Sequence, residues 1–356
     1  MCATTRILAD FLLAVDLDFD SKNETVHFGF DPAVCLRISK RGAILADSKV
    51  AKTHGASIQK ALGYELIEVP SGEKYKTRET KQALEDELFR RKLGKDSLLV
   101  AVGGGVTTDL VGFLASTYMR GAPLVLIPTT LLAMVDAAIG GKTGVNTSFG
   151  KNLVGSFYLP KAVIIDLSLI KSLPEKEMKN GLSEILKYGL IEDAAIWKKC
   201  EHWKSELEFL IRSSITCKMN VVSQDFEEKT GLRRILNFGH TVGHALELMS
   251  DFEMPHGEAV ALGCMAESYL SHLLGYLSKE TLESILHLYR KLGYSFRKFD
   301  RNAFHEAMTL DKKSKEGSPR FVLIDRIGHC VPFDGAYCTP VKKSELDKLV
   351  EWMNHG

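Results

Sequence analysis

The chain has 356 residues, of which 45% are hydrophobic and 26% are charged, so its composition is that of a globular protein and not of a disordered or fibrous one. Its 46 lysines and arginines balance its 45 aspartates and glutamates, and no basic excess points to nucleic acid. The 7 scattered cysteines form no CxxC pair, which argues against a disulfide framework and favours the reducing cytoplasm. Acidic residues interrupt the N-terminal stretch and no apolar run approaches ~20 residues, so neither a signal peptide nor a membrane helix is expected.

The first half of the chain alternates between strand-like and helix-like segments. Short apolar runs predict strands at residues 42–47, 65–70, 97–102, 124–128 and 162–166, and helical spacing of apolar residues predicts helices at 77–92 and 107–120. Strand, glycine turn, helix and strand in succession are typical of an open parallel α/β sheet.

Helical periodicity dominates after residue 174. Helices are predicted at residues 175–189, 196–222, 241–249, 257–274, 279–292 and 301–309, with one strand at 321–324. We therefore expect an α/β domain over residues 1–174 and a mainly helical domain over residues 175–356.

Two glycine-rich segments are candidates for phosphate binding. Residues 103–105 are three glycines between a strand and a helix, where backbone N–H groups can approach a pyrophosphate. Thr108 stands where the G-x-G-x-x-G fingerprint has its last glycine, so a nucleotide site and a plain tight turn both remain open. The second segment, residues 140–143, resembles the end of a P-loop, but Asp136 replaces the glycine at its start, which excludes an ordinary P-loop ATPase.

A histidine cluster follows in the helical half. His240 and His244 are four residues apart and so share one helix face, and His256 follows twelve residues after His244. Such imidazoles can bind a divalent metal, although core histidines or helix caps would give the same pattern. Thr241 stands where the zinc-protease motif H-E-x-x-H requires glutamate, so that class is not expected.

Glu184 and Lys187 lie three residues apart among apolar neighbours. A carboxylate on the apolar face of a helix needs a partner, which a metal or Lys187 would supply. The spacing alone does not decide between a metal ligand and an intrahelical ion pair.

In their order along the chain, these segments resemble the 3-dehydroquinate synthases, a family of sugar-phosphate cyclases. The matching segments run in family order over roughly residues 40 to 325. They are residues 103–105 with Asp109, 118–121, 128–133, 135–136, 140–146, 150–152, 184–189, 236–241, 244–247, 256–260 and 311–313.

The resemblance implies an NAD- and metal-dependent lyase of the shikimate pathway, which leads to chorismate and the aromatic amino acids, with zinc or cobalt as the metal. Its substrate would be 3-deoxy-D-arabino-heptulosonate 7-phosphate. Transient oxidation by NAD, phosphate elimination, re-reduction and an intramolecular aldol step would give 3-dehydroquinate and phosphate. The implied fold is a Rossmann-like NAD-binding domain followed by a helical domain, with the active site in the cleft between them. A cytoplasmic homodimer is expected.

The resemblance also implies residue roles. Glu184, His240 and His256 would be the metal ligands. NAD would be held by Asp47, Ser71, Gly72, Glu73, Lys74, Tyr75, Lys76, Gly103, Gly104, Gly105, Val106, Thr107, Thr108, Asp109, Thr129, Thr130, Lys142, Lys151, Leu169, Ile170, Lys171 and Ser172. Catalytic and substrate-contacting residues would be Asp136, Lys142, Lys151, Asn152, Lys187, Arg233, Asn237, His244, Lys312 and Arg120, the last reaching the phosphate within its own chain or from a partner subunit.

The chain departs from the family pattern at a few positions, none of which removes a proposed ligand. Thr108 replaces a glycine in the turn, and Ala137 and Ala138 replace serines. Ser172 replaces a threonine and keeps the hydroxyl. Whether Lys312 or its neighbour Lys313 faces the substrate is left open.

Three other functions are alternatives to that of a dehydroquinate synthase. A sister cyclase would act on sedoheptulose 7-phosphate or glucose 6-phosphate, but Asn152, Asn237 and His244 follow the dehydroquinate synthase pattern. An iron-dependent alcohol or glycerol dehydrogenase would follow its glycine turn with Asp-Ala-Lys, whereas here Leu110 and Val111 follow Asp109. A non-catalytic binding protein would not need so complete a set of charged site residues, because unpaired buried charge is costly.

Overall fold

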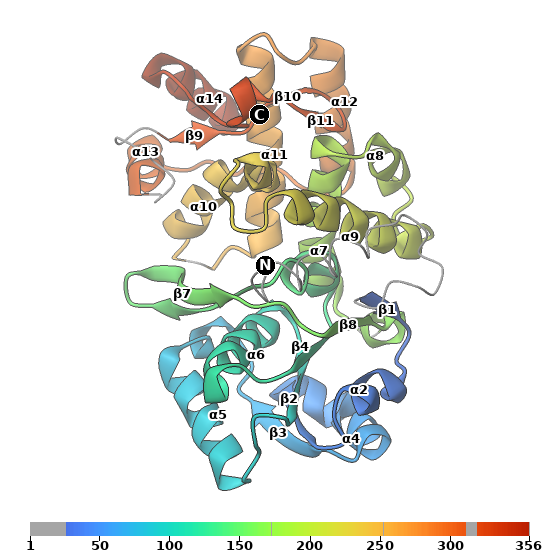
Figure 1. Cartoon of the computed structure of the whole chain (residues 1–356). Coiled ribbons are helices and arrows are strands. Elements are labelled where there is room, and N and C mark those ends of the chain that lie inside the picture. The colour runs from blue at the N-terminus through green and yellow to red at the C-terminus, as the bar shows by residue number, and fades with distance from the viewer. Residues whose placement is uncertain (1–25, 172, 252, 311–318, 356) are drawn as a thin grey trace. The chain divides into compact units, whose positions relative to one another are not determined.

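The computed structural model describes residues 26–171, 173–251, 253–310 and 319–355 (Figure 1). Contacts divide the chain into two compact units, the first ending at Glu177 and the second beginning at Met178. Across these described ranges, no helix is long and apolar enough to cross a membrane.

A six-stranded parallel sheet forms the centre of the first unit. In spatial order its strands are β1 (Val26–Phe28), β8 (Ala162–Ile165), β5 (Leu124–Pro128), β4 (Leu98–Gly103), β2 (Gly42–Asp47) and β3 (Glu65–Val69). Every residue of β4, β5 and β8 is buried, as expected for parallel strands that are covered on both faces. All five strands predicted from apolar runs in this half are present, and the short β1 is an addition.

Helices connect these strands. They are α2 (Pro32–Ile38), α3 (Ser48–Val50), α4 (Ala56–Leu62), α5 (Arg78–Arg90) and α6 (Gly105–Thr117), with the single turns η1 (Ala51–Gly55), η2 (Glu73–Tyr75), η3 (Tyr118–Arg120), η4 (Ala133–Ala137) and η5 (Leu167–Ile170). Helix α6 packs on β4, β5 and α5, while α2 packs on α4. In Figure 1 the α5–α6 pair and the α2–α4 pair flank the strands on opposite sides.

The order of the strands reverses between β2 and β4. From β2 the chain moves outward to β3, and it then returns to build β4, β5 and β8 in the other direction. The carboxyl ends of parallel strands share one edge of the sheet, and ligands of open α/β sheets bind at such a reversal. A ligand of the first unit is therefore expected at the carboxyl ends of β2 and β4.

An antiparallel hairpin of β6 (Lys142–Thr147) and β7 (Gly150–Phe157) begins within the second glycine-rich segment, and no strand was predicted there. Its residues do not alternate between apolar and polar, so the usual strand signal is missing. The close pairing depends on glycine, because a Cβ atom on Gly155 would lie 1.9 Å from the carbonyl oxygen of Thr143.

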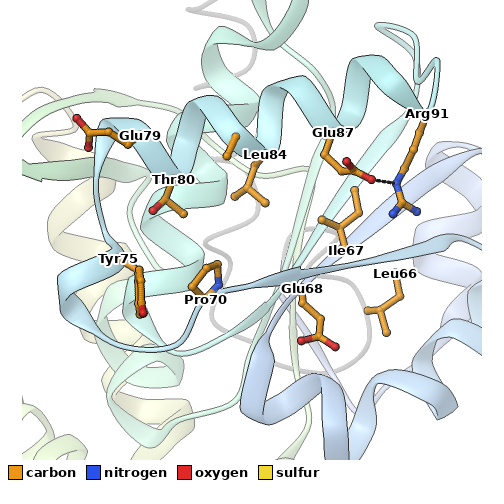
Figure 2. Close-up of a pocket in the computed structure, with 11 residues that line it drawn as sticks. Leu66, Ile67, Glu68, Pro70, Tyr75, Glu79, Thr80, Leu84, Glu87 and Arg91 are labelled. Carbon is orange, nitrogen blue, oxygen red and sulfur yellow. Dashed lines mark hydrogen bonds and ion pairs between the residues drawn. The ribbon is translucent and has the colours of Figure 1, made fainter.

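A cavity of about 600 Å³ lies beside the edge strand β3, between β3 and α5 (Figure 2). Pro70 and Tyr75 line one end of it. At the other end the guanidinium of Arg91 pairs with the carboxylate of Glu87 at 2.7 Å. No residue predicted as catalytic or metal-binding lines it, and of the predicted NAD residues only Tyr75 does.

The second unit is mainly helical. Its elements are α7 (Glu175–Ile191), which starts in the last residues of the first unit, α8 (Ala194–Cys200), α9 (Leu207–Gln224), η6 (Leu232–Asn237), α10 (His240–Met249), α11 (His256–Leu273), α12 (Lys279–Lys291), α13 (Arg301–Leu310), η7 (Phe333–Gly335), α14 (Lys343–His355) and the short strand pairs β9 (Arg320–Phe321) with β12 (Thr339–Pro340) and β10 (Ile324–Arg326) with β11 (His329–Cys330). Helix α11 is the centre of this unit, because α10, α12 and α14 all pack against it. The strand predicted at 321–324 is divided between β9 and β10.

The single helix predicted at 196–222 is wrong, since the structure has α8 and α9 with a turn between them. A continuous helix of that length would extend about 40 Å, whereas α8 and α9 pack against each other. The turn keeps Trp203 buried, and the ammonium of Lys199 pairs with the carboxylate of Glu206 across it at 2.7 Å. These contacts lie outside a local periodicity, which is why the sequence pattern does not show the break.

Candidate active site

Glu184 lies in the buried half of α7, and 0% of its surface is exposed. Lys187, one turn later, is also buried, and its Nζ is 2.5 Å from Oε2 of Glu184. The other carboxylate oxygen, Oε1, faces two imidazoles: Nε2 of His256 at 3.3 Å and Nε2 of His240 at 3.6 Å. An ion pair with Lys187 and a role as metal ligand are therefore compatible, because they use different oxygens.

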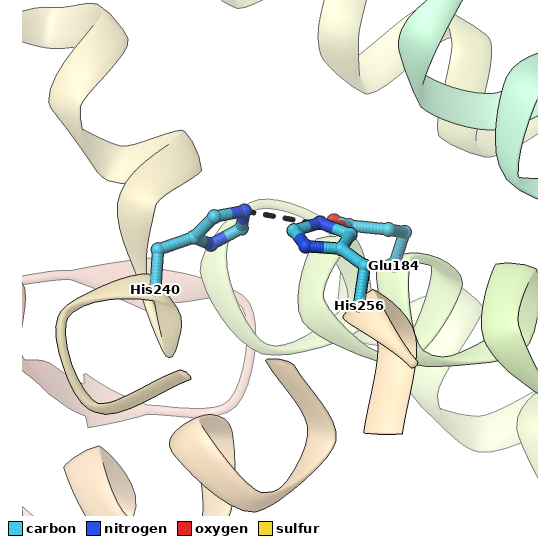
Figure 3. A group of neighbouring side chains, drawn as sticks. All are labelled: Glu184, His240 and His256. Atoms are coloured by element: carbon cyan, nitrogen blue, oxygen red, sulfur yellow. Dashed lines mark ion pairs between the residues drawn. The ribbon is translucent and has the colours of Figure 1, made fainter. Parts of the chain in front are cut away.

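The two imidazoles come from the first residues of neighbouring helices. His240 begins α10 directly after Gly239, which has a φ of 79°, and His256 begins α11 directly after Pro255. The ligand atoms of Glu184, His240 and His256 all lie within 4.8 Å of one another (Figure 3). The ring of His244 stands edge-on to the ring of His240, with 5.5 Å between their centroids.

This donor set fits a divalent transition metal. One carboxylate and two imidazoles are ligands that zinc and cobalt accept, and three protein ligands leave positions free for a substrate. The Nδ1 atoms of both histidines have other partners, the carbonyl oxygen of Phe238 at 3.2 Å and Oε2 of Glu247 at 3.4 Å. Such outer contacts orient an imidazole so that its Nε2 is available to a metal.

The charge of the cluster favours a cation. Burial by itself lowers the pKa of His256. The hydrogen bonds to the carboxylates of Glu184 and Glu247 outweigh this effect and raise the pKa to about 10. Glu184 beside Nε2 and Glu247 beside Nδ1 thus favour positive charge at the ring of His256, which a proton or a metal ion can supply.

The residues of η6, just before α10, add charge and polarity to the same unit. Arg233 is only 2% exposed; its Nη1 donates to the carbonyl oxygen of Phe226 at 2.7 Å, and its Nε lies 3.8 Å from the carboxylate of Glu228. Asn237 is the last residue of η6. The second unit therefore contains Glu184, Lys187, Arg233, Asn237, His240, His244 and His256 of the predicted site.

Comparison with known proteins gives separate evidence on the family of the chain. Residues 66–180 match the family model described as 3-dehydroquinate synthase N-terminal, and residues 181–314 match the one described as 3-dehydroquinate synthase C-terminal. The 3-dehydroquinate synthase of Campylobacter concisus is 40% identical over 328 residues, which cover 90% of this chain and 95% of that protein. The chain belongs to the 3-dehydroquinate synthase family.

Solved structures of sister enzymes share the fold. The 2-epi-5-epi-valiolone synthase ValA from Streptomyces hygroscopicus, solved with NAD+ and Zn2+, matches with a TM-score of 0.84 and 28% identity over 93% of this chain and 96% of that one. A 2-deoxy-scyllo-inosose synthase solved with carbaglucose-6-phosphate, NAD+ and Co2+ matches with a TM-score of 0.82 and 26% identity, covering 92% of this chain and 96% of that one.

The glycine turn of this family member joins β4 to α6. A Cβ atom on Gly103 would lie 2.6 Å from the side chain of Thr107, so this position requires glycine. Helix α6 starts at Gly105 with no side-chain cap, which leaves its first N–H groups available to an anion. Thr108, the departure from the family pattern, is buried and donates its hydroxyl to the carbonyl oxygen of Gly105 at 3.1 Å.

A hydrogen-bonded cluster links the glycine turn to the loop after β3 and to the β6–β7 hairpin. Lys76 is 4% exposed, and its Nζ lies 2.6 Å from both Oδ2 of Asp109 and Oδ1 of Asn152. Asn146 donates its backbone N–H to the carbonyl oxygen of Lys76 and its side-chain amide to Glu73, each at 2.7 Å. Asn152, predicted as a substrate residue, thus contacts a predicted NAD residue.

Other predicted NAD residues follow the carboxyl ends of parallel strands, whereas Lys142 and Lys151 lie on the antiparallel β6–β7 hairpin. Asp47 ends β2, where its carboxylate accepts from the N–H of Lys49, and Thr129 and Thr130 follow β5. Leu169, Ile170 and Lys171 lie in or after η5, beyond β8, and Asp136 lies in η4. Ser172 and Lys312 lie outside the described residues.

Several buried polar residues of the second unit were not predicted as site residues. Glu247 contacts His256 and lies seven residues after His240, a helical spacing that could have identified it. Lys218 is a buried lysine on α9. Its position among apolar residues in the sequence could have identified it. Asp225 and Glu267 bind backbone N–H groups, for which a sequence carries no pattern.

Proposed function

We propose that this chain is a 3-dehydroquinate synthase, which converts 3-deoxy-D-arabino-heptulosonate 7-phosphate into 3-dehydroquinate and phosphate. The observation that carries the proposal is the cluster of Glu184, His240 and His256, which this family member forms from segments far apart in its sequence. The first unit would bind NAD and the second the metal and the substrate.

The cofactors are one NAD and one divalent metal, zinc or cobalt. When bound, they supply reversible hydride transfer and polarisation of a substrate hydroxyl. The chain's own residues hold and orient them. The ammonium of Lys187 pairs with Oε2 of Glu184, while the Nδ1 contacts of His240 and His256 orient both imidazoles with Nε2 toward Oε1 of Glu184.

Cationic side chains in both units match a substrate that carries a phosphate and a carboxylate. Lys142 and Lys151 lie on the β6–β7 hairpin, and Lys187 and Arg233 are buried in the second unit. Charge-assisted hydrogen bonds from such groups are about twice as strong as neutral ones. Arg120 would contact the phosphate, either within its own chain or, in a cytoplasmic homodimer, from a partner subunit.

A sister cyclase is the second candidate, because the solved neighbours at 26% and 28% identity are such enzymes. The 40% identity to a 3-dehydroquinate synthase favours the first assignment. Asn152, Asn237 and His244 follow the same family's pattern.

The test is incubation of the chain with the heptulosonate phosphate, NAD and Zn2+, with phosphate release and the product followed by NMR. We expect one phosphate and one 3-dehydroquinate per substrate, and no net NADH. Turnover of sedoheptulose 7-phosphate or glucose 6-phosphate instead would favour a sister cyclase. Net NADH formation from glycerol would favour a polyol dehydrogenase.

A further inference from the structure

A buried carboxylate on α11 holds the first turn of α10. Glu267 has 0% of its surface exposed; its Oε2 accepts from the N–H of Gly239 at 2.8 Å, and its Oε1 accepts from the N–H of Val242 at 3.4 Å. Gly239 is the N-cap residue of α10, and Val242 is the third residue of that helix.

This contact replaces a cap that α10 does not supply itself. In a capping box, the N-cap side chain accepts from the N–H of the third residue, and the carboxylate of that residue accepts from the N-cap N–H. Neither Gly239 nor Val242 carries such a group, and α10 has no side-chain cap of its own. Glu267 accepts both bonds, and its charge lies at the helix end that favours an anion.

Glycines seat the first turn of α10 closely on α11. A Cβ atom on Gly239 would lie 2.5 Å from Sγ of Cys264, and one on Gly263 would lie 1.8 Å from the carbonyl oxygen of Gly239. Gly263, Cys264 and Glu267 follow one face of α11 at helical spacing. The face of α11 that receives the first turn of α10 is therefore the face that presents the carboxylate.

The first turn of α10 carries His240, and few rotatable bonds separate its imidazole from the backbone. The backbone just before the helix also orients the ring, because Nδ1 contacts the carbonyl oxygen of Phe238 at 3.2 Å. Movement of this turn would change the distance from Nε2 of His240 to Glu184, which is 3.6 Å here.

We propose that Glu267 is a positioning residue for the metal centre, which anchors the N-terminus of α10 and thereby holds His240 against Glu184 and His256. This inference rests on the proposed function, because it takes His240 to be a metal ligand. Glu267 itself touches neither metal nor substrate in this assignment.

The test compares the full chain with Glu267→Gln, which keeps the side-chain shape but provides one acceptor where two are needed. Co2+ affinity is measured by competition with a chelator, and the ligand geometry is followed by the visible absorption of bound Co2+. We expect a loss of Co2+ affinity of about 10-fold to 100-fold, the range for residues that support metal ligands. The Co2+ spectrum should change, and excess Co2+ should restore most of kcat.

Two controls separate positioning from general stability. Glu283→Gln makes the same chemical change on an exposed side chain of α12, and Ile196→Ala opens a cavity in α8; both should keep wild-type Co2+ affinity and spectrum. Should Glu267→Gln fail to fold, Glu267→Asp, which keeps the charge but withdraws it by one methylene, carries the same test.

A folded Glu267 variant with wild-type Co2+ affinity and spectrum would overturn the proposal. An equal loss of affinity in Ile196→Ala would also overturn it, because the effect would then follow stability alone. If the wild-type chain itself binds no Co2+, the proposed function fails, and that result is distinct from a failure confined to the variant.

Discussion

At the scale of single residues, the contacts of Glu184 explain how α7 accommodates a buried charge. A carboxylate removed from water is costly unless it is paired, and here Oε2 contacts Lys187 while Oε1 faces two imidazoles. Truncating any partner would leave the others with uncompensated charge. The chemistry of the site therefore depends on the whole cluster and not on one contact.

Replacing His256 tests this dependence. In His256→Ala the cluster loses one of its three predicted metal ligands, so we expect metal content to fall close to zero and turnover to drop by about 10³-fold or more, since metal polarisation contributes several kcal/mol. Metal analysis and steady-state assays measure the two effects. His287→Ala, on an exposed part of α12, is the matched control and should behave as wild type. Normal metal content and activity in His256→Ala would remove it from the metal site.

Spacing predicted part of this cluster and left the rest open. The i, i+3 spacing placed Glu184 and Lys187 on one helix face, and the i, i+4 spacing did the same for His240 and His244. No local pattern brings Glu184, His240 and His256 together, because they come from three helices; the family resemblance supplied that grouping. The structure places the three side chains together, and their binding of a metal stays a prediction.

At the scale of elements, Glu184 and Lys187 lie inside α7, whereas other site residues of the second unit lie at helix starts or in the turn before one: Arg233, Asn237, His240 and His256. The segment from Asp225 to η6 shows how such a turn is fixed. The carboxylate of Asp225 is buried and accepts from the backbone N–H groups of Thr230, Gly231 and Arg233 at 2.9, 3.1 and 3.0 Å. Asp225 thus closes the turn that presents Arg233.

This turn predicts a pH dependence of stability. Burial raises the pKa of Asp225, but the N–H groups of Arg233, Thr230 and Gly231 lower it more, so the folded-state pKa lies below its ordinary value. The stabilisation is therefore fully present above the unfolded pKa, about 3.9, and is lost as the pH falls through the folded value.

Asp225→Asn should reduce the free energy of unfolding by about 1–3 kcal/mol at pH 7, because the neutral amide cannot accept all three bonds as strongly. The loss should shrink below pH 4. Urea unfolding at several pH values measures both effects, with Asp334→Asn, on an exposed turn, as the control. A loss that is constant from pH 7 to pH 3 would contradict this role.

Elements with a clear pattern of apolar residues were predictable from the sequence, and elements defined by turns were not. Apolar runs identified β2, β4, β5 and β8 because these parallel strands are buried on both faces, and they also identified the edge strand β3, which buries Ile67 and Val69. The β6–β7 hairpin depends on glycine contacts between its own strands, and the break between α8 and α9 depends on packing of one helix on the other. Neither leaves a periodic signal in the sequence.

At the scale of the whole molecule, the order of motifs along the chain carried the family assignment. Each motif alone was also compatible with a purely structural role, such as a tight turn or a core histidine. Their order is matched by two family models and by relatives that cover 90% of the chain, and the fold matches sister cyclases with TM-scores of 0.82 and 0.84. The α/β unit followed by a helical unit was predictable on other grounds, because apolar runs alternate with helical spacing before residue 174 and helical spacing dominates after it.

The most direct test of the account is a crystal structure of the chain grown with Zn2+, with anomalous scattering measured at the zinc edge. We predict one strong peak per chain, within bonding distance of a carboxylate oxygen of Glu184 and of Nε2 of His240 and His256. A peak elsewhere, or no peak between these three side chains in a chain that forms 3-dehydroquinate, would contradict it.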